Sequence, residues 1–161
     1  MSPILLIFMQ LTVIAFAFVG GVFLAFSDFI MRSLTRTSTI GGVEAMQSIN
    51  REVCRWVFMT VFLGLVPASL MIIVYGGVIV GHAAGLLMAG AGVVYVIGCF
   101  GVTVLCNVPL NTALASMNAS ALSTQEFWTG TYLPRWTFWN TVRTLACGVS
   151  ALLLMFGLSQ L

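Results

Sequence analysis

The chain has 161 residues, of which 60% are hydrophobic and only 6% are charged. Soluble domains carry about 25% charged residues, so this composition excludes a surface built for water and predicts a lipid environment. The net charge of +2 comes from six arginines and four acidic residues. It is too small for a nucleic-acid-binding protein, and no basic stripe interleaved with aromatic residues is present.

Four apolar runs are long enough to cross a bilayer, which needs about 20 residues. The N-terminal run lacks the basic segment of a secretory signal, so we expect it to stay as an uncleaved span. Residues 56–125 carry no formal charge and suit two spans separated by the glycine-rich segment YGGVIVGHAAG. The predicted spans are about 4–27, 53–75, 83–106 and 136–158. The sequence therefore predicts an all-α bundle of four transmembrane helices, with residues 1–161 as a single integral membrane domain.

Two long linkers, residues 32–52 and 107–134, connect these spans. TSTIGG in the first predicts a helix start, and Asn107 before Val108-Pro109 in the second fits a helix N-cap. We therefore expect short helices in both linkers. Four spans place both linkers, with the charged side chains, on one side. By the positive-inside rule that side is cytoplasmic and both termini lie outside, and we expect a bacterial inner membrane.

Small residues and cysteines in the spans favour helix packing over chemistry. Gly81, Gly85 and Ala89 repeat every four residues, as close helix contacts in lipid require. The cysteines, at positions 54, 99, 106 and 147, form no CxxC or Cys/His pattern, so we expect buried thiols. A single histidine, His82, excludes a haem held by two histidines of one chain. The expectation is therefore no metal and no cofactor.

The segment RWTFWNTVRT, residues 135–144, carries two arginines, two tryptophans and an asparagine. On a helix, Trp136, Asn140 and Arg143 share one face. An arginine one to two turns inside an apolar helix usually faces the bundle interior and pairs with a partner. Three acids are available as partners: Asp28, Glu44 and Glu52. Asparagine gains little from lipid headgroups, so we expect a polar pocket here.

Other polar residues gather on the linker side. Asn107 and Asn111 are four residues apart, as are Gln47 and Arg51. Asn50, Glu44 and Asp28 complete the predicted set. A simpler interpretation applies to residues that anchor helices at membrane interfaces. It covers Trp128, Tyr132 and Trp139, and the headgroup arginines Arg32, Arg36 and Arg135.

The motifs FSDFIMRSL, GGVEAMQSIN, NVPLN and WTFWNTVRT occur in this order. Together they resemble the family of small four-span membrane proteins that includes fungal anthrone oxygenases and many bacterial members of unknown function. The resemblance implies a four-helix membrane bundle. In the characterised members it also implies oxygen-dependent conversion of an anthrone to an anthraquinone, with no established metal or flavin. Its motifs fall on Asn50, Asn107, Asn111, Trp136, Asn140 and Arg143. A histidine often follows the asparagine of the last motif, where this chain has Thr141, so that motif offers no acid–base group.

We therefore expect an oxidoreductase for a hydrophobic aromatic or quinone-like molecule. Arg143 and Asn140 would stabilise a substrate anion, and Glu44 or Asp28 would be the base. The residues expected to bind substrate are Asn50, Gln47, Asn107, Asn111 and Trp136. The alternative is a non-catalytic membrane protein that holds a lipid or partner helix in this pocket. A transporter is a weaker alternative because the chain shows no inverted repeat. The expected partners are a hydrophobic small molecule and membrane lipids, and no nucleic acid is expected. The sequence leaves open whether the chain forms a homo-oligomer.

Overall fold

The computed structural model describes residues 1–161 apart from Cys54 and Trp56. The predicted buried thiol of Cys54 and the start of the uncharged run at Trp56 lie outside the described residues. All regular structure in the described part of the chain is helical, which confirms the predicted all-α fold. With η marking π-helical segments, the elements in chain order are α1 (Pro3–Ala25), η1 (Phe26–Ile30), α2 (Met31–Thr35), α3 (Thr39–Glu52), α4 (Val57–Val74), η2 (Tyr75–Val80), α5 (Ala83–Val94), η3 (Tyr95–Gly101), η4 (Thr103–Asn107), α6 (Val108–Ala115), α7 (Leu122–Phe127), η5 (Trp128–Tyr132) and α8 (Leu133–Ser159).

Among the described residues, four helical segments are long and apolar enough to cross a membrane, and one predicted span falls largely within each. They are Pro3–Thr35, Val57–Val80, Ala83–Ala115 and Leu122–Ser159. The expected linker helices are present, but most of them continue the spans directly. A segment of 33 residues is about 50 Å long, whereas a hydrocarbon core is about 30 Å thick. The bundle therefore extends well beyond the hydrocarbon core of a bilayer.

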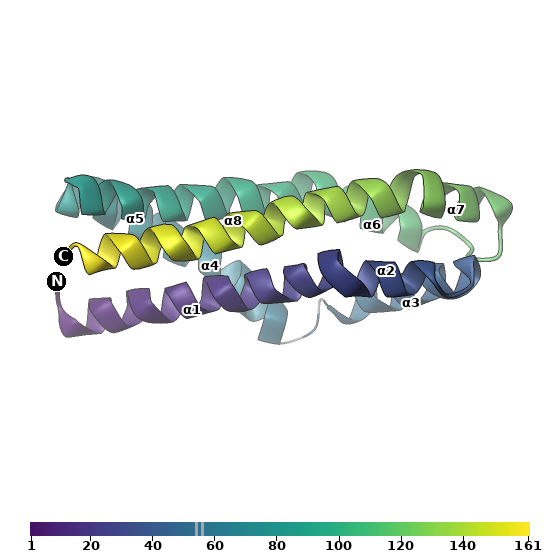
Figure 1. The fold of residues 1–161 in the computed structure, drawn as a ribbon, viewed down its shortest axis with the longest axis horizontal. Coiled ribbons are helices and arrows are strands. Elements are labelled where there is room, and N and C mark those ends of the chain that lie inside the picture. Colours follow the sequence, from purple (N-terminus) through teal and green to yellow (C-terminus); the bar gives the residue numbers. More distant parts are fainter. Residues whose placement is uncertain (54, 56) are drawn as a thin grey trace.

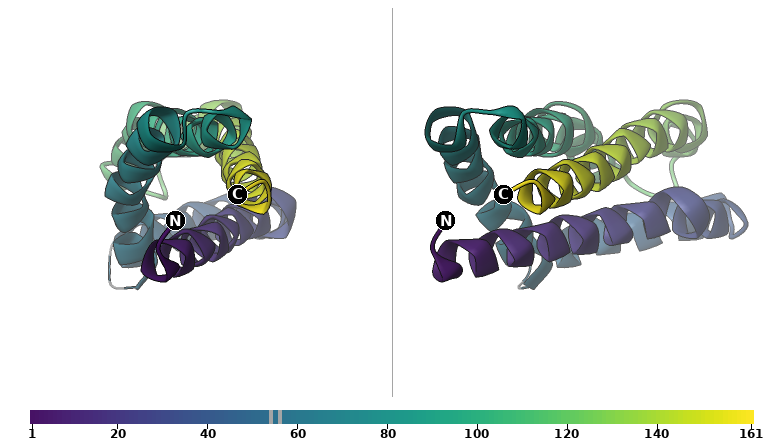
Figure 2. Two further views of the ribbon diagram at one scale, coloured as in Figure 1. Left: turned by 90° about the vertical axis from the view of Figure 1, so that its left-hand side faces the viewer. Right: turned by 60° about the vertical axis from the view of Figure 1, so that its left-hand side comes forward.

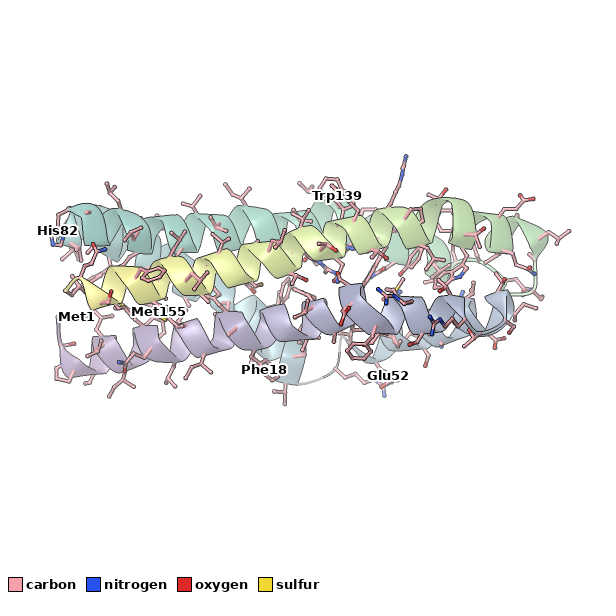
Figure 3. The ribbon with its side chains drawn as sticks, in the orientation of Figure 1. Met1, Phe18, Glu52, His82, Trp139 and Met155 are labelled. Atoms are coloured by element: carbon pink, nitrogen blue, oxygen red, sulfur yellow. The ribbon has the colours of Figure 1, made fainter. Side chains whose placement is uncertain are left out.

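The long segments run side by side as a bundle (Figures 1 and 2). α8 packs against α1 and α5, and α4 packs against α5 and α1. α3 packs against α2 and α6, and takes the position next to α2 that α4 holds next to α1 in the other half (Figure 1). Both termini and His82 lie at one end of the bundle, while Glu52 lies away from that end (Figure 3).

Glycines allow a close helix contact between η2 and α5. A Cβ atom on Gly85 would collide with the carbonyl oxygen of Gly76, so the two backbones touch. The prediction that Gly85 serves helix packing is therefore confirmed. Gly81 acts differently from its predicted packing role. It ends η2 in the left-handed region with φ of 69°, which glycine adopts at little cost.

Two local expectations had different outcomes. The predicted helix start in TSTIGG is confirmed, because α3 begins at Thr39 and the Ser38 hydroxyl accepts a 3.1 Å hydrogen bond from the Gly41 amide. Asn107 precedes α6 and Pro109 lies in its first turn, as predicted, but the Asn107 side chain makes no capping hydrogen bond because the helix continues into α6 from η4. Its side chain is consequently available to bind a neighbouring helix.

Buried cysteines lie in the apolar half of the bundle core. Cys99 and Cys147 are fully buried, and their sulfur atoms are 3.3 Å apart. Both are free thiols, as predicted for cysteines that pack as small apolar side chains, whereas Cys106, also predicted to be buried, is only partly buried. Nearby, the Tyr95 hydroxyl donates a 2.7 Å hydrogen bond to the Phe62 carbonyl, which ties η3 to α4.

Candidate functional site

Arg143 lies on α8 with its guanidinium inside the bundle, and the residue is only 5% exposed. Its Nη2 donates a 2.6 Å hydrogen bond to Asn140 Oδ1, and Nη1 donates a 3.2 Å hydrogen bond to Thr103 Oγ1. Cζ lies 4.1 Å from the ring centroid of Phe23 and 5.4 Å from that of Trp136. The expected inward orientation is therefore present, with amide, hydroxyl and aromatic partners.

The prediction that a carboxylate pairs with Arg143 is wrong. Among the described residues the one ion pair joins Arg55 to Glu52, at 3.2 Å on the exposed surface. Because the partners of Arg143 are all neutral, its positive charge is not compensated within the described protein. Two of its five N–H bonds are used by these partners, and Nε is buried without a hydrogen-bond partner.

Asn140 holds this arginine in place and is itself fully buried. Its amide nitrogen donates two 2.7 Å hydrogen bonds, to the Phe23 carbonyl and to Ser27 Oγ. Both acceptors belong to the first long segment, so the side chain ties α8 to α1 and η1. With both amide hydrogens committed, the carbonyl oxygen points to the guanidinium.

A second polar network lies toward the linker end. Asn111 Oδ1 accepts two 2.8 Å hydrogen bonds, from the Tyr132 hydroxyl and from the Trp136 indole nitrogen. Asn50 donates a 3.3 Å hydrogen bond to the same hydroxyl. The ring of Tyr132 stacks between those of Trp128 and Trp136. The network therefore joins α3, α6, η5 and α8 and fixes the indole near Arg143.

Two further predicted residues connect helices. Asn107 is buried and donates a 3.2 Å hydrogen bond to the Trp136 carbonyl, while its Oδ1 has no partner. Gln47 donates both amide hydrogens, at 2.8 and 2.9 Å, to the carbonyls of Leu114 and Met117. Gln47 therefore attaches α3 to the end of α6.

A cavity of about 310 Å³ lies between these networks, at the lower end of the range for small-molecule sites. Of the predicted residues it brings together Arg143, Trp136, Asn111, Asn50 and Gln47. Asn140 and Asn107 are behind the wall, bonded to residues that line it. Part of the lining is aromatic, from Phe23, Phe58 and Phe62, whose ring centroids lie within 6.2 Å of one another.

The two proposed bases, Glu44 and Asp28, are both exposed and do not line this cavity. Their assignment as a catalytic base stays a prediction that the geometry of the cavity does not support. No three histidine, cysteine, aspartate or glutamate side chains gather as a metal site in the part of the chain that the structure describes.

Thr141 lies away from the cavity. It is exposed, its hydroxyl is 3.0 Å from Ser27 Oγ, and both residues line a shallow groove on another face of the bundle. A histidine at this position, as the resemblance leads us to expect, would extend from the groove side of α8. The replacement by threonine therefore leaves the cavity lining unchanged.

Sequence reasoning missed Thr103 and Phe23. Thr103 precedes Asn107 by four residues and Asn111 by eight, so a polar stripe on one helix face was a usable signal. Phe23 sits among many apolar residues of the first span, and nothing in the pattern distinguishes it. The π-helical segments η1, η4 and η5 contribute residues to the cavity or its networks, and such segments are frequent at functional sites.

Comparison with known proteins identifies the family. A family model described as anthrone oxygenase matches residues 55–153, which include all of α4, α5 and α6 and most of α8. No curated protein and no solved structure matches the chain. The matched residues contain Thr103, Asn111, Asn140 and Arg143, and cover well over half of the sequence. The chain therefore belongs to the anthrone oxygenase family.

Proposed function

We propose that this cavity binds a flat, anthrone-like aromatic molecule and promotes its oxidation by molecular oxygen. The observation that carries the proposal is the buried guanidinium of Arg143, which lines an aromatic cavity and has no anionic partner among the described residues. An unpaired cation in such a cavity favours a ligand with a negative oxygen.

Aromatic side chains would bind the rings of the substrate. Phe58 and Phe62 are stacked, with an interplanar angle of 10° and centroids 6.1 Å apart, and Phe23 meets both edge-on. Trp136 forms part of the lining on the Arg143 side. Fused rings gain apolar burial and ring–ring contact from such walls.

Arg143 would act on the ionisation of the substrate itself. Loss of a proton from the methylene carbon of an anthrone gives an anion whose charge lies largely on the carbonyl oxygen. A guanidinium beside that oxygen lowers the free energy of the anion, which is the form that donates electrons to oxygen. Because no carboxylate lines the cavity among the described residues, we assign proton removal to water at the cavity mouth.

The overall reaction is balanced without another reductant. One anthrone and one O₂ give one anthraquinone and one water, so the methylene carbon is oxidised to a carbonyl and oxygen is reduced. Within this proposal the protein supplies binding, orientation and stabilisation of the anion. Asn140 and Thr103 contribute by holding the guanidinium through the 2.6 and 3.2 Å hydrogen bonds.

Placement in the membrane is part of the same proposal. The described charged side chains other than the buried Arg143 lie in the half of the bundle away from the termini, and by the positive-inside rule we assign this half to the cytoplasm. If the apolar half fills about 30 Å of hydrocarbon, about 20 residues of α1 are used. The boundary then falls near Val22 and Phe26, both in the cavity lining. A lipid-soluble substrate would reach the cavity from the leaflet.

Oxygen uptake with anthrone tests this proposal in purified protein in an uncharged detergent. The intact protein should consume one O₂ per anthrone and form anthraquinone, and Arg143→Met should fall to the uncatalysed rate. The matched control is Arg55→Gln, which removes an exposed arginine outside the cavity and should keep the full rate. Circular dichroism would verify that each variant is folded. A fully active Arg143→Met protein would overturn the assignment.

A binding measurement beside oxygen uptake separates the non-catalytic alternative. Binding of anthraquinone quenches tryptophan fluorescence if the ligand lies next to Trp136. Binding that Arg143→Met abolishes, without any oxygen uptake by the intact protein, would favour a binding protein over an oxygenase.

A further inference from the structure

The cavity has a strong charge asymmetry. Two of the six arginines, Arg51 and Arg143, line it, whereas none of the four acidic residues does, and all of these are within the described part of the chain. The two arginines have different surroundings. Arg143 is buried, and Arg51 is exposed, so they mark the interior and the rim of one site.

Arg51 has no ion-pair partner among the described residues. The nearest acid in the sequence, Glu52, pairs with Arg55 at 3.2 Å. A simpler role for Arg51 is interaction with the C-terminal end of α3, where a cation stabilises the helix dipole. That role affects folding but gives no preference among ligands, so a binding measurement distinguishes the two roles.

The cavity mouth lies between the end of α3 and one face of α6. Of the lining residues, the exposed ones are Arg51 on α3 and Val108, Thr112 and Ala115 on α6. Gln47, also on α3, commits both amide hydrogens to backbone carbonyls. Arg51 is therefore the charged donor at a largely apolar mouth.

We propose that the ligand of this cavity is a flat aromatic acid whose carboxylate pairs with Arg51 at the mouth. This inference rests on the proposed function and narrows its substrate class. The rings lie against Phe23, Phe58 and Phe62, the reacting oxygen lies toward Arg143, and the carboxylate remains at the wet rim. An amphipathic ligand oriented in this way places its charged end at the membrane interface and its apolar body in the bundle.

A pair of product-like probes tests the inference, because neither is consumed. Anthraquinone-2-carboxylate and anthraquinone-2-carboxamide have nearly the same shape and differ by one negative charge. Their Kd values are measured by tryptophan fluorescence quenching in uncharged detergent at low salt. We expect the acid to bind about fivefold more tightly than the amide, the upper end for an exposed ion pair, with a smaller ratio at high salt.

Two variants assign the preference to a residue. Arg51→Gln should bind both probes with the affinity that the intact protein has for the amide, so its amide Kd also shows that the site is folded. Arg55→Gln, the matched control, should keep the preference for the acid. Equal binding of both probes by the intact protein, or a preference that survives Arg51→Gln, would overturn the inference and leave the proposed function intact. Binding of neither probe would instead overturn the proposed function.

Discussion

Substitution of Asn140 by alanine should destabilise the bundle more than any other loss of a single polar side chain near the cavity. The change removes three hydrogen bonds, to Arg143, Phe23 and Ser27, from a fully buried position. A hydrogen bond from a charged donor contributes about 1.5–3 kcal/mol. Each bond between helices in a membrane contributes about 0.6–1.7 kcal/mol. The lower values together give a loss of about 3 kcal/mol in the free energy of unfolding.

Reversible unfolding in mixed micelles, followed by circular dichroism, measures this loss. The matched control is Thr141→Ala, one residue along the same helix. Its exposed hydroxyl contacts Ser27 at 3.0 Å and its own helix at 2.9 Å, so its loss should cost less than about 1 kcal/mol. If Asn140→Ala is no more destabilising than this control, the hydrogen bonds that hold Arg143 are not as described, and the positioning role of Asn140 fails.

Three further substitutions, two of them paired with a control, test the packing around the site. Gly85→Ala should cost about 2 kcal/mol or more in unfolding free energy, because its methyl group meets backbone of η2. A Cβ atom added at Gly64 would have no atom within 4 Å, so Gly64→Ala should not lower the free energy of unfolding. Tyr95→Phe should lose about 1 kcal/mol with its hydrogen bond to α4, whereas Tyr75→Phe should lose little. Asn111→Leu should release the indole and phenol that share its oxygen, so tryptophan emission should shift although the helical content is kept.

The fold could be predicted because few physical solutions exist for this composition. Uncharged runs of about 20 residues in a charge-poor chain leave little alternative to helices in lipid. The extent of the helices could not be predicted in the same way. Asn107 followed by Pro109 has the pattern of a helix start, but proline also fits where a helix has already locally opened its hydrogen bonding, as in η4. Local patterns do not distinguish these two cases.

The site was predictable where residue type and spacing carry the signal. Trp136, Asn140 and Arg143 share a face of α8, and the cost of a buried cation implies an inward direction. The hydrogen-bond partners of Asn140 and Arg143 were not predictable. Asp28 and Glu44 face outward because carboxylates retain their hydration there, whereas the backbone carbonyl of Phe23 and the hydroxyl of Thr103 become partners only through the three-dimensional arrangement.

The neutral partners of Arg143 have a consequence for binding. Burial of a guanidinium costs several kcal/mol of hydration free energy, and amide, hydroxyl and ring contacts recover part of this cost. A carboxylate in their place would recover more, but it would also neutralise the cavity and compete with an anionic ligand. Because the cation is already out of water in the folded protein, an incoming anion meets a guanidinium that needs little further desolvation. The same arrangement that limits the stability of the bundle therefore strengthens its attraction for a negative oxygen, and Asn140 is the residue on which both effects depend.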